Sequence, residues 1–362
     1  MKIIHTGDIH LGAAMRTLPP DKARLRGAEI VDTFRVLCSY ARGNGIGAVL
    51  IAGDLFDENG VHKSLVAEIF SIISSAQPVC FFYITGNHDD GLALDGVVIP
   101  QNLYVFSKNR GWQSYDLPEG ITVTGIDGKY LTPDSYFSLR LRTERFNIVM
   151  LHGEAVGTER TGKDQLALPR LQNKNIDYLA LGHIHIPTMQ AERLDGRGKY
   201  RYCGCLEGRG FDECGKRGFF LLDIRGGQLY TENFVSIAKR EAVVCTADIS
   251  ACNSYYDVER TALSALSGVS AGSMVKLVLR GRHRADLRKD IPMLTGRLSQ
   301  SYFFIKIVDE SRIFIDYAQY KNDLSERGEF VREVGRYEMS EEERSEILEV
   351  GLKALAGEEI DL

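Results

Sequence analysis

Short polar motifs follow five apolar runs in this chain, at the points where buried strands would end. The motifs are Asp8-x-His10, Gly53-Asp54, Gly86-Asn87-His88-Asp89, His152-Gly153 and Gly182-His183-x-His185. Because ligands bind at the carboxyl ends of strands in an open α/β sheet, we expect these motifs to converge on one cleft. Carboxylates, imidazoles and an amide oxygen suit a pair of divalent metal ions with mixed nitrogen and oxygen ligation, whereas thiolates would select a softer ion.

The charges of these side chains indicate what such a site would bind. One aspartate can bridge two ions about 3.5 to 4 Å apart, the spacing that activates a water and stabilises in-line displacement at phosphorus. The two-residue step from Asp8 to His10 lets both side chains face one ion. Two divalent ions carry more charge than Asp8 and Asp54 neutralise, so the site would attract a phosphodiester. A single histidine of this kind is more often only a hydrogen-bonded turn residue, and the joint occurrence of the motifs favours metal binding.

The elements that must position these motifs alternate between strands and helices, as in a layered α/β domain. Strands are expected over 3–5, 48–52, 79–85, 121–126, 147–151, 178–181 and 219–224. Apolar residues at three- and four-residue spacing predict helices over 25–41 and 65–73, packed on a sheet. A hairpin is expected over 189–202, turning at Asp195-Gly196.

After about residue 239 the pattern changes to a smaller α+β arrangement that ends in two helices. The last helix, over 340–356, opens with the capping box Ser340-x-x-Glu343 and carries a broad apolar stripe. That stripe either packs back on the preceding domain or lies against a partner. The predicted division is a metal-binding domain over 1–239, a small cap domain over 240–317 and a C-terminal helical segment over 318–362.

These motifs resemble those of the calcineurin-like metallophosphoesterases and, within them, the SbcD-type DNA repair nucleases. The matching segments are Thr6 to Gly12, Gly53 to Asp57, Gly86 to Asp89, Leu151 to Gly153 and Gly182 to His185. The narrower resemblance rests on His10-Leu11-Gly12, on Gly53 to Asp57, and on Tyr202-x-Gly204 through Gly210-Phe211 to Gly218-Phe219. It implies an α/β fold, a four-layer α/β/β/α metallophosphoesterase sandwich with a small α+β cap domain and C-terminal helices. Gly7 departs from the small hydroxyl residue or alanine usual before the first aspartate.

The resemblance also assigns roles position by position. It implies that Asp54 bridges two divalent ions, most often manganese in this family, and that His88 faces the scissile phosphate. Asp57 and Asp89 would orient ligands through hydrogen bonds, and a plain turn or capping role for them is an equal alternative. One ion would be held by Asp8, His10 and His185, and the other by Asn87, His152 and His183.

The function implied is metal-dependent hydrolysis of DNA phosphodiesters by an exonuclease or endonuclease. The family's nuclease subunits work with an SbcC-type coiled-coil ATPase, which the acidic C-terminal helices would contact. Whether two copies form a homodimer stays open. The alternatives are a phosphodiesterase or phosphatase for a smaller substrate and, from another class, a non-catalytic adaptor for an ATPase. The complete set of ligand positions argues against the adaptor.

Composition and charge limit these interpretations. The chain has 362 residues, 44% hydrophobic and 26% charged, which is ordinary for globular proteins and predicts about two domains. The net charge is −5, but residues 326–362 carry −7, which leaves +2 on the rest. The basic stretch that includes Arg282 and Arg284 is therefore a candidate DNA contact, with a solvated surface as the alternative. Neither a membrane segment nor a signal peptide is expected, so we expect a cytoplasmic protein.

Cysteine usage agrees with a reducing compartment. Seven cysteines, an odd number, are scattered through the chain, which argues for free thiols and against a disulfide framework. Cys203, Cys205 and Cys214 are close enough in sequence to form a metal site. Buried or strand-end thiols are the favoured interpretation for these three.

Overall fold

The structure is a computed structural model, and it describes residues 1–57, 61–89, 97–106, 111–159, 162–284, 287–314, 320 and 322–356. The chain forms two compact units, Met1–Glu241 and Ala242–Leu362. Each unit is described by itself below. The boundary predicted between residues 317 and 318 lies outside the described residues.

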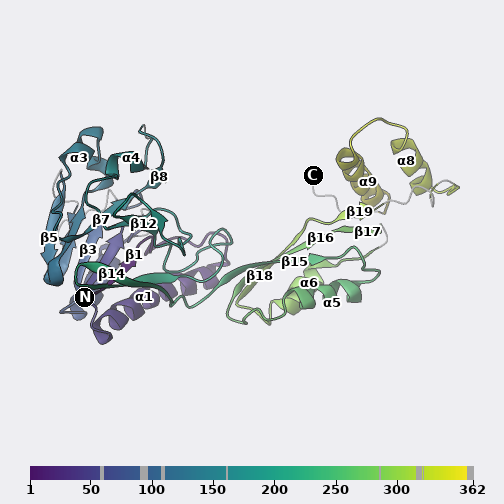
Figure 1. Cartoon of the computed structure of the whole chain (residues 1–362). Coiled ribbons are helices and arrows are strands. Elements are labelled where there is room, and N and C mark those ends of the chain that lie inside the picture. Colours follow the sequence, from purple (N-terminus) through teal and green to yellow (C-terminus); the bar gives the residue numbers. More distant parts are fainter. Residues whose placement is uncertain are drawn as a thin grey trace. The chain divides into compact units, whose positions relative to one another are not determined.

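Two six-stranded sheets form the centre of the first unit (Figure 1). The first sheet has the strand order β14-β13-β1-β2-β3-β4, and the second has the order β11-β12-β10-β7-β6-β5. The strands of the first sheet are β1 (Lys2–Thr6), β2 (Ala48–Ala52), β3 (Cys80–Ile84), β4 (Leu103–Val105), β13 (Gly218–Arg225) and β14 (Gln228–Ser236). Those of the second are β5 (Gln113–Leu117), β6 (Ile121–Gly125), β7 (Phe146–His152), β10 (Tyr178–Gly182), β11 (Glu192–Arg193) and β12 (Lys199–Tyr202).

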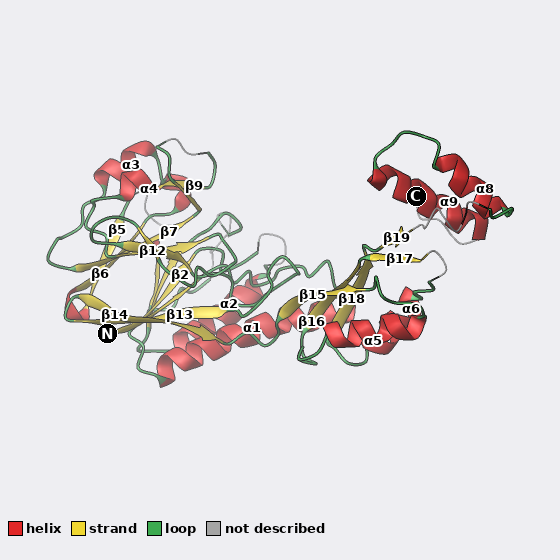
Figure 2. Ribbon diagram, turned by 45° about the vertical axis from the view of Figure 1, so that its right-hand side comes forward, coloured by secondary structure: helices red, strands yellow, loops and turns green. Residues whose placement is uncertain are grey.

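Helices complete the layers of this unit. The first sheet is accompanied by α1 (Pro20–Gly43) and α2 (Lys63–Ser75), and the second by α3 (Pro133–Ser138) and α4 (Leu168–Leu171) (Figure 2). A short parallel pair, β8 (Glu154–Val156) and β9 (Gln165–Ala167), lies near α4. The prediction of a four-layer α/β/β/α sandwich is confirmed, and the predicted hairpin is present as the antiparallel pair β11 and β12.

Alternation along the strands explains the layering. In β2 every residue is buried: Leu50 belongs to the core between the two sheets, and Val49 and Ile51 point to the opposite face. A parallel strand that is covered on both faces has a continuous run of apolar residues. The bounds of β2 could therefore be predicted from the sequence. Tyr136 and Leu171, from α3 and α4, join the core on the outer face of the second sheet.

A buried ionic network ties α1 to the loop between β12 and β13. Arg26 donates to both Glu29 and Glu207, at 2.8 Å in each case. Glu207 also accepts from the Lys239 backbone, and Arg240 donates to Glu29 at 2.6 Å. These contacts fix the loop after β12 against the long first helix.

The second unit begins with an α+β arrangement of strands and helices between Ala242 and Phe314. Its parallel sheet has the order β15-β16-β18, and α5 and α6 lie against one face of it (Figure 1). A separate parallel pair is formed by β17, which comes after β16 in the chain, and β19, which comes after β18. The elements are β15 (Ala242–Asp248), α5 (Tyr255–Ala265), β16 (Met274–Arg280), β17 (Arg282–Arg284), α6 (Ile291–Leu298), β18 (Phe304–Asp309) and β19 (Arg312–Phe314).

Two C-terminal helices, α8 (Glu326–Val334) and α9 (Glu341–Ala356), pack on each other and on β19. The predicted capping box is present, because the Ser340 hydroxyl accepts from the Glu343 backbone while Glu343 accepts from the Ser340 backbone. The apolar stripe of α9 is divided: Leu348 is buried against α8, whereas Ile347 is 43% exposed. Within the described residues, no helix is both long enough and apolar enough to cross a membrane.

Candidate metal centre

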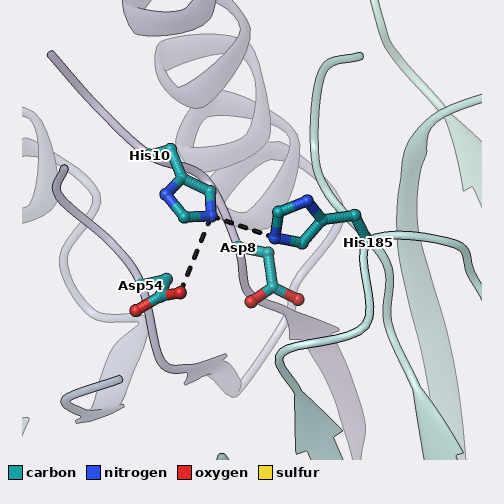
Figure 3. Close-up of side chains that lie close together, drawn as sticks. All are labelled: Asp8, His10, Asp54 and His185. Carbon is teal, nitrogen blue, oxygen red and sulfur yellow. Dashed lines mark hydrogen bonds and ion pairs between the residues drawn. The ribbon is translucent and has the colours of Figure 1, made fainter. Parts of the chain in front are cut away.

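The five motifs meet at the carboxyl ends of strands from both sheets of the first unit. The loops after β1, β2 and β3 come from the first sheet, and the loops after β7 and β10 come from the second. Figure 3 shows four of their side chains, Asp8, His10, Asp54 and His185, turned toward one another. The expected convergence on one site is therefore what the fold produces.

The backbone at this site is held in unusual conformations. Asp8, His10, Asp54 and His183 all have positive φ, a region that residues other than glycine seldom adopt. A Cβ on Gly53 would lie 2.1 Å from Nδ1 of His152. Strained positions of this kind cluster at functional sites because the surrounding structure imposes them.

The first ligand group consists of Asp8, His10, Asp54 and His185, each with one ligand atom within 4.8 Å of the others. Nε2 of His10 lies 3.1 Å from Nε2 of His185 and 3.6 Å from Oδ2 of Asp54. Three of the four side chains are buried, and that of His185 is partly exposed. This is the set that the resemblance implies for one ion together with the bridging aspartate.

The second ligand group surrounds the amide oxygen of Asn87. Oδ1 of Asn87 lies 2.9 Å from Nε2 of His152 and 3.2 Å from Nδ1 of His183. Nε2 of His152 is 3.4 Å from Oδ2 of Asp54. The same oxygen of Asp54 therefore approaches imidazoles of both groups, while its Oδ1 accepts from the His88 backbone at 2.9 Å.

The donor set fits two cations on chemical grounds. Nδ1 of His152 faces the Ala52 carbonyl at 2.9 Å and must donate to it, which leaves only a lone pair on Nε2 of a neutral ring. That lone pair then faces the acceptor oxygen of Asn87. Two acceptors so close need a proton or a cation between them. The residues present therefore fit a pair of divalent ions with nitrogen and oxygen ligands.

The pKa values of these side chains point the same way. Burial alone would lower the pKa of His152, but its hydrogen bond to Asp54 and the nearby carboxylates raise that pKa to about 9. The surroundings that favour a positive charge on this ring would also stabilise a cation held by the same oxygens. Burial lowers the pKa of His10 to about 2 with Arg209 acting in the same direction, so this ring is neutral and able to ligate. Burial raises the pKa of Asp8 to about 6.

Three further predicted residues of the first unit, Asp57, His88 and Asp89, lie around these two groups. His88 stacks edge-on against His10, with ring centroids 4.9 Å apart, and forms a second cluster with His10 and Asp57. Asp89 is buried and makes no hydrogen bond to a proposed ligand: it accepts from the Tyr83 hydroxyl and from the amides of Leu55 and Gly86, in the loops that carry Asp54 and Asn87. It positions the site by joining two loops.

Two residues that sequence reasoning missed hold His185. Glu213 accepts from Nδ1 of His185 at 2.6 Å, and Arg209 donates to the same Glu213 oxygen at 2.9 Å. Burial by itself would raise the pKa of Glu213, but hydrogen bonds from His185 and Arg209 lower it. A carboxylate behind a ligating histidine fixes its tautomer and orientation. The segment Gly210-Phe211 contributed to the resemblance, but nothing in the sequence indicated that Glu213 reaches His185.

The three neighbouring cysteines are not brought together as metal ligands. Cys203 and Cys205 are buried, Cys214 is partly buried, and the metal-type clusters found among the described residues contain no cysteine. Sγ of Cys205 lies 3.7 Å from Glu213. Burial raises the pKa of both the Cys203 and the Cys205 thiols, which are therefore neutral.

A cavity of about 610 Å³ opens beside the second ligand group. Asn87 and His152 form part of its wall, and Leu131, Tyr136 and Arg170 form another part. Its volume is within the range of small-ligand sites, about 300 to 1,000 Å³. The cavity adjoins the Asn87 and His152 side of the centre.

The family model described as calcineurin-like phosphoesterase matches residues 1–187, which contain every proposed metal ligand. This chain belongs to the calcineurin-like phosphoesterases. It is therefore a metallophosphoesterase, a hydrolase of phosphoester bonds, and its candidate two-metal centre lies within the matched segment.

Three curated relatives extend the similarity beyond the matched segment. The uncharacterized metallophosphoesterase YhaO of Bacillus subtilis is 26% identical, over 78% of this chain and 72% of its own length. The DNA double-strand break repair protein Mre11 of Methanopyrus kandleri is 26% identical, over 66% of this chain and 57% of its own. The SbcD component of the nuclease SbcCD of Escherichia coli K12 is 23% identical, over 90% of both chains.

Proposed function

We propose that this chain is a manganese-dependent DNA nuclease, the phosphodiesterase subunit of a complex with an SbcC-like coiled-coil ATPase. The observation that supports it most is the arrangement of seven ligand-type residues as two groups around one oxygen of Asp54, in a chain similar over 90% of its length to a component of a bacterial nuclease. Imidazole with hard oxygen ligands is compatible with manganese.

In this proposal each residue has a defined task. Asp8, His10 and His185 hold one divalent ion, and Asn87, His152 and His183 the other. Asp54 holds both. When bound, the ions activate a water and neutralise charge on the phosphate. His88 is not a ligand: it donates a hydrogen bond to a phosphate oxygen or a proton to the leaving oxygen.

The decisive experiment is a cleavage assay on linear DNA and on bis(p-nitrophenyl) phosphate with and without manganese, using the chain alone and with its ATPase. Manganese-dependent cleavage of both substrates supports the proposal, and Asp54→Asn serves as the inactive control. Hydrolysis of the small diester without any DNA cleavage, even with the ATPase, would instead favour a phosphodiesterase for a smaller substrate. The cavity beside Asn87 is the observation that favours this second candidate.

A DNA contact in the second unit is proposed for Arg282 and Arg284. They flank the buried His283 on β17, so alternation places both arginines on the exposed face. Phosphate contacts of this kind are independent of base sequence and weaken as salt rises. Changing both to Glu should reduce DNA affinity and flatten its salt dependence. The control Arg260→Glu, on the exposed surface of α5, should do neither.

The partner contact is proposed for the exposed part of the α9 stripe. Ile347 and Leu355 are 43% and 41% exposed, while Leu348 is used in packing against α8. Ile347→Glu with Leu355→Glu should abolish co-purification with the ATPase and leave the melting temperature nearly unchanged. Leu263→Glu, an exposed apolar residue on α5, is the matched control. Unchanged co-purification of the double variant would contradict this assignment.

A further inference from the structure

Arg209 lies in the loop between β12 and β13 and reaches the edge of the first ligand group. Its backbone amide donates to Oε2 of Glu213 at 2.6 Å, and its Nε and Nη2 approach Oε1 at 3.2 and 2.9 Å. Both oxygens of the carboxylate are thus engaged by one residue. The orientation of the guanidinium is restricted, because two of its nitrogens share Oε1 while the backbone amide of the same residue holds Oε2.

The hydrogen bonds around Glu213 also fix the tautomer of His185. Nδ1 of His185 lies 2.6 Å from Oε1 of Glu213 and 3.0 Å from Nη2 of Arg209. Glu213 can only accept, so the shorter of these two contacts requires the proton on Nδ1, and Nη2 then lies beside the ring without a hydrogen bond to it. Nε2 of His185 then presents a lone pair toward His10, on the side where an ion would be held. Glu213 is therefore a positioning residue for this ligand.

One edge of the guanidinium is left over after these contacts. Nη1 makes no hydrogen bond to another described residue, and the nearest carboxylate oxygen on that side, Oδ2 of Asp57, is 3.8 Å away. The side chain of Arg209 is 20% exposed, so Nη1 is accessible at the site. The two N–H groups of Nη1 are therefore available to donate to an anion that enters the site.

Nη1 of Arg209 and the ring of His88 lie on the same side of the first ligand group. Asp57, the carboxylate closest to Nη1, also belongs to the cluster formed with His10 and His88. His10 in turn contacts both His88 and His185 through ring edges, each at 4.9 Å between centroids. Arg209 and His88 therefore approach the same side of the first ligand group from different loops.

We propose that Arg209 is a phosphate-contacting residue, whose Nη1 edge donates to a nonbridging oxygen of the phosphate bound at the metal centre. The inference rests on the proposed function for the identity of that phosphate as part of a phosphodiester. Guanidinium suits this role because its charge is permanent and its fork matches phosphate oxygens. Glu213 holds the fork in place and, through the same oxygen, orients His185.

The test uses inorganic phosphate binding to the full chain loaded with manganese, measured by calorimetry, together with the number of bound ions from elemental analysis. At saturating manganese, Arg209→Ala should keep two ions, because Glu213 still holds His185, and should weaken phosphate binding about tenfold or more, the loss expected for one charge-assisted hydrogen bond. Arg209→Lys should fall between that variant and the wild type. Arg225→Ala, which removes an exposed arginine paired with Asp223 on β13, should bind phosphate normally.

Phosphate affinity of Arg209→Ala equal to that of Arg225→Ala would overturn the inference. A fall to one bound ion in both Arg209 variants would overturn it too, because Arg209 would then support the metal and not the phosphate. Lack of phosphate binding by the wild type would have the same consequence. The proposed function is tested separately: Arg209-dependent phosphate binding without DNA cleavage would leave the phosphate contact standing and remove the nuclease assignment.

Discussion

The two halves of the metal centre are supported in different ways. His185, in the first half, is held by the charged pair of Glu213 and Arg209 from a distant loop. His152, in the second half, is held by the Ala52 carbonyl, a backbone group of β2 in the other sheet. The first half is bordered by ionised side chains, and the second half opens onto a cavity.

The two histidines therefore differ in whether mutation can remove the group that holds them. A backbone carbonyl cannot be changed by mutation without moving the strand, so the second half depends mainly on the fold. Side-chain support can be altered one atom at a time, and removing such a partner typically lowers metal affinity or activity about 10- to 100-fold. We therefore expect the first half to be the easier one to empty by substitutions outside the ligands.

The largest effect is expected where the halves join. Asp54→Asn removes the negative charge whose Oδ2 approaches imidazoles of both groups, so both ions should bind more weakly and hydrolysis should be lost. Asn87→Ala should mainly empty the second half. Elemental analysis of the two variants distinguishes them. Two fully occupied sites in Asp54→Asn would contradict the bridging role.

In the proposed function His88 is not a ligand of either half, so its loss should affect only turnover. His88→Ala is expected to reduce kcat by about 10² or more, because the hydrogen bond to the phosphate or the proton for the leaving oxygen is lost, while two ions still bind. The check is steady-state kinetics on bis(p-nitrophenyl) phosphate combined with metal counting. Loss of one ion from this variant would make His88 part of the first half.

Glu213→Gln tests the asymmetry directly. Gln can still accept from Nδ1 of His185 but has no negative charge, so manganese affinity should fall about 10- to 100-fold in the first half only. Isothermal titration of the metal-free protein should show one weakened and one unchanged site. Equal weakening of both sites would mean that the halves are not independently supported. Glu192→Gln, on β11, is a control remote from the ligands.

The cavity beside the second half should give the smallest effect. Leu131→Trp places a larger side chain in its wall, so cleavage of DNA should fall several-fold if the cavity receives part of the substrate. Hydrolysis of bis(p-nitrophenyl) phosphate should be nearly unchanged, because that substrate needs only the metal centre. Equal loss on both substrates would indicate a general distortion of the site.

The sequence predicted the layered fold well where strands are buried on both faces. The run over 48–52 is wholly apolar, and β2 has those bounds. β14 was missed, because it is an edge strand in which exposed and partly buried residues, many of them polar, interrupt the pattern. The apolar stripe of α9 was predicted, but not which of its residues are buried. The packing of α8 on α9 buries Leu348 and leaves Ile347 exposed, and a single sequence does not show how two helices pack.

The candidate site could be predicted as far as its residues lie in local motifs. Asp8, Asn87 and His183 each follow a recognisable strand, so their convergence could be inferred from topology. Glu213 and Arg209 follow no such strand, and their partner His185 is more than 20 residues away. Long-range side-chain contacts of this kind leave no periodic signal in a single sequence.

The positive φ angles of Asp8, His10, Asp54 and His183 have a consequence for how this protein can change. Each costs the metal-free fold on the order of 1 kcal/mol relative to a glycine at the same place. Substitution by glycine would therefore relieve the backbone while removing a ligand. Selection for heat resistance alone would favour such losses, so the catalytic centre persists only under selection for activity.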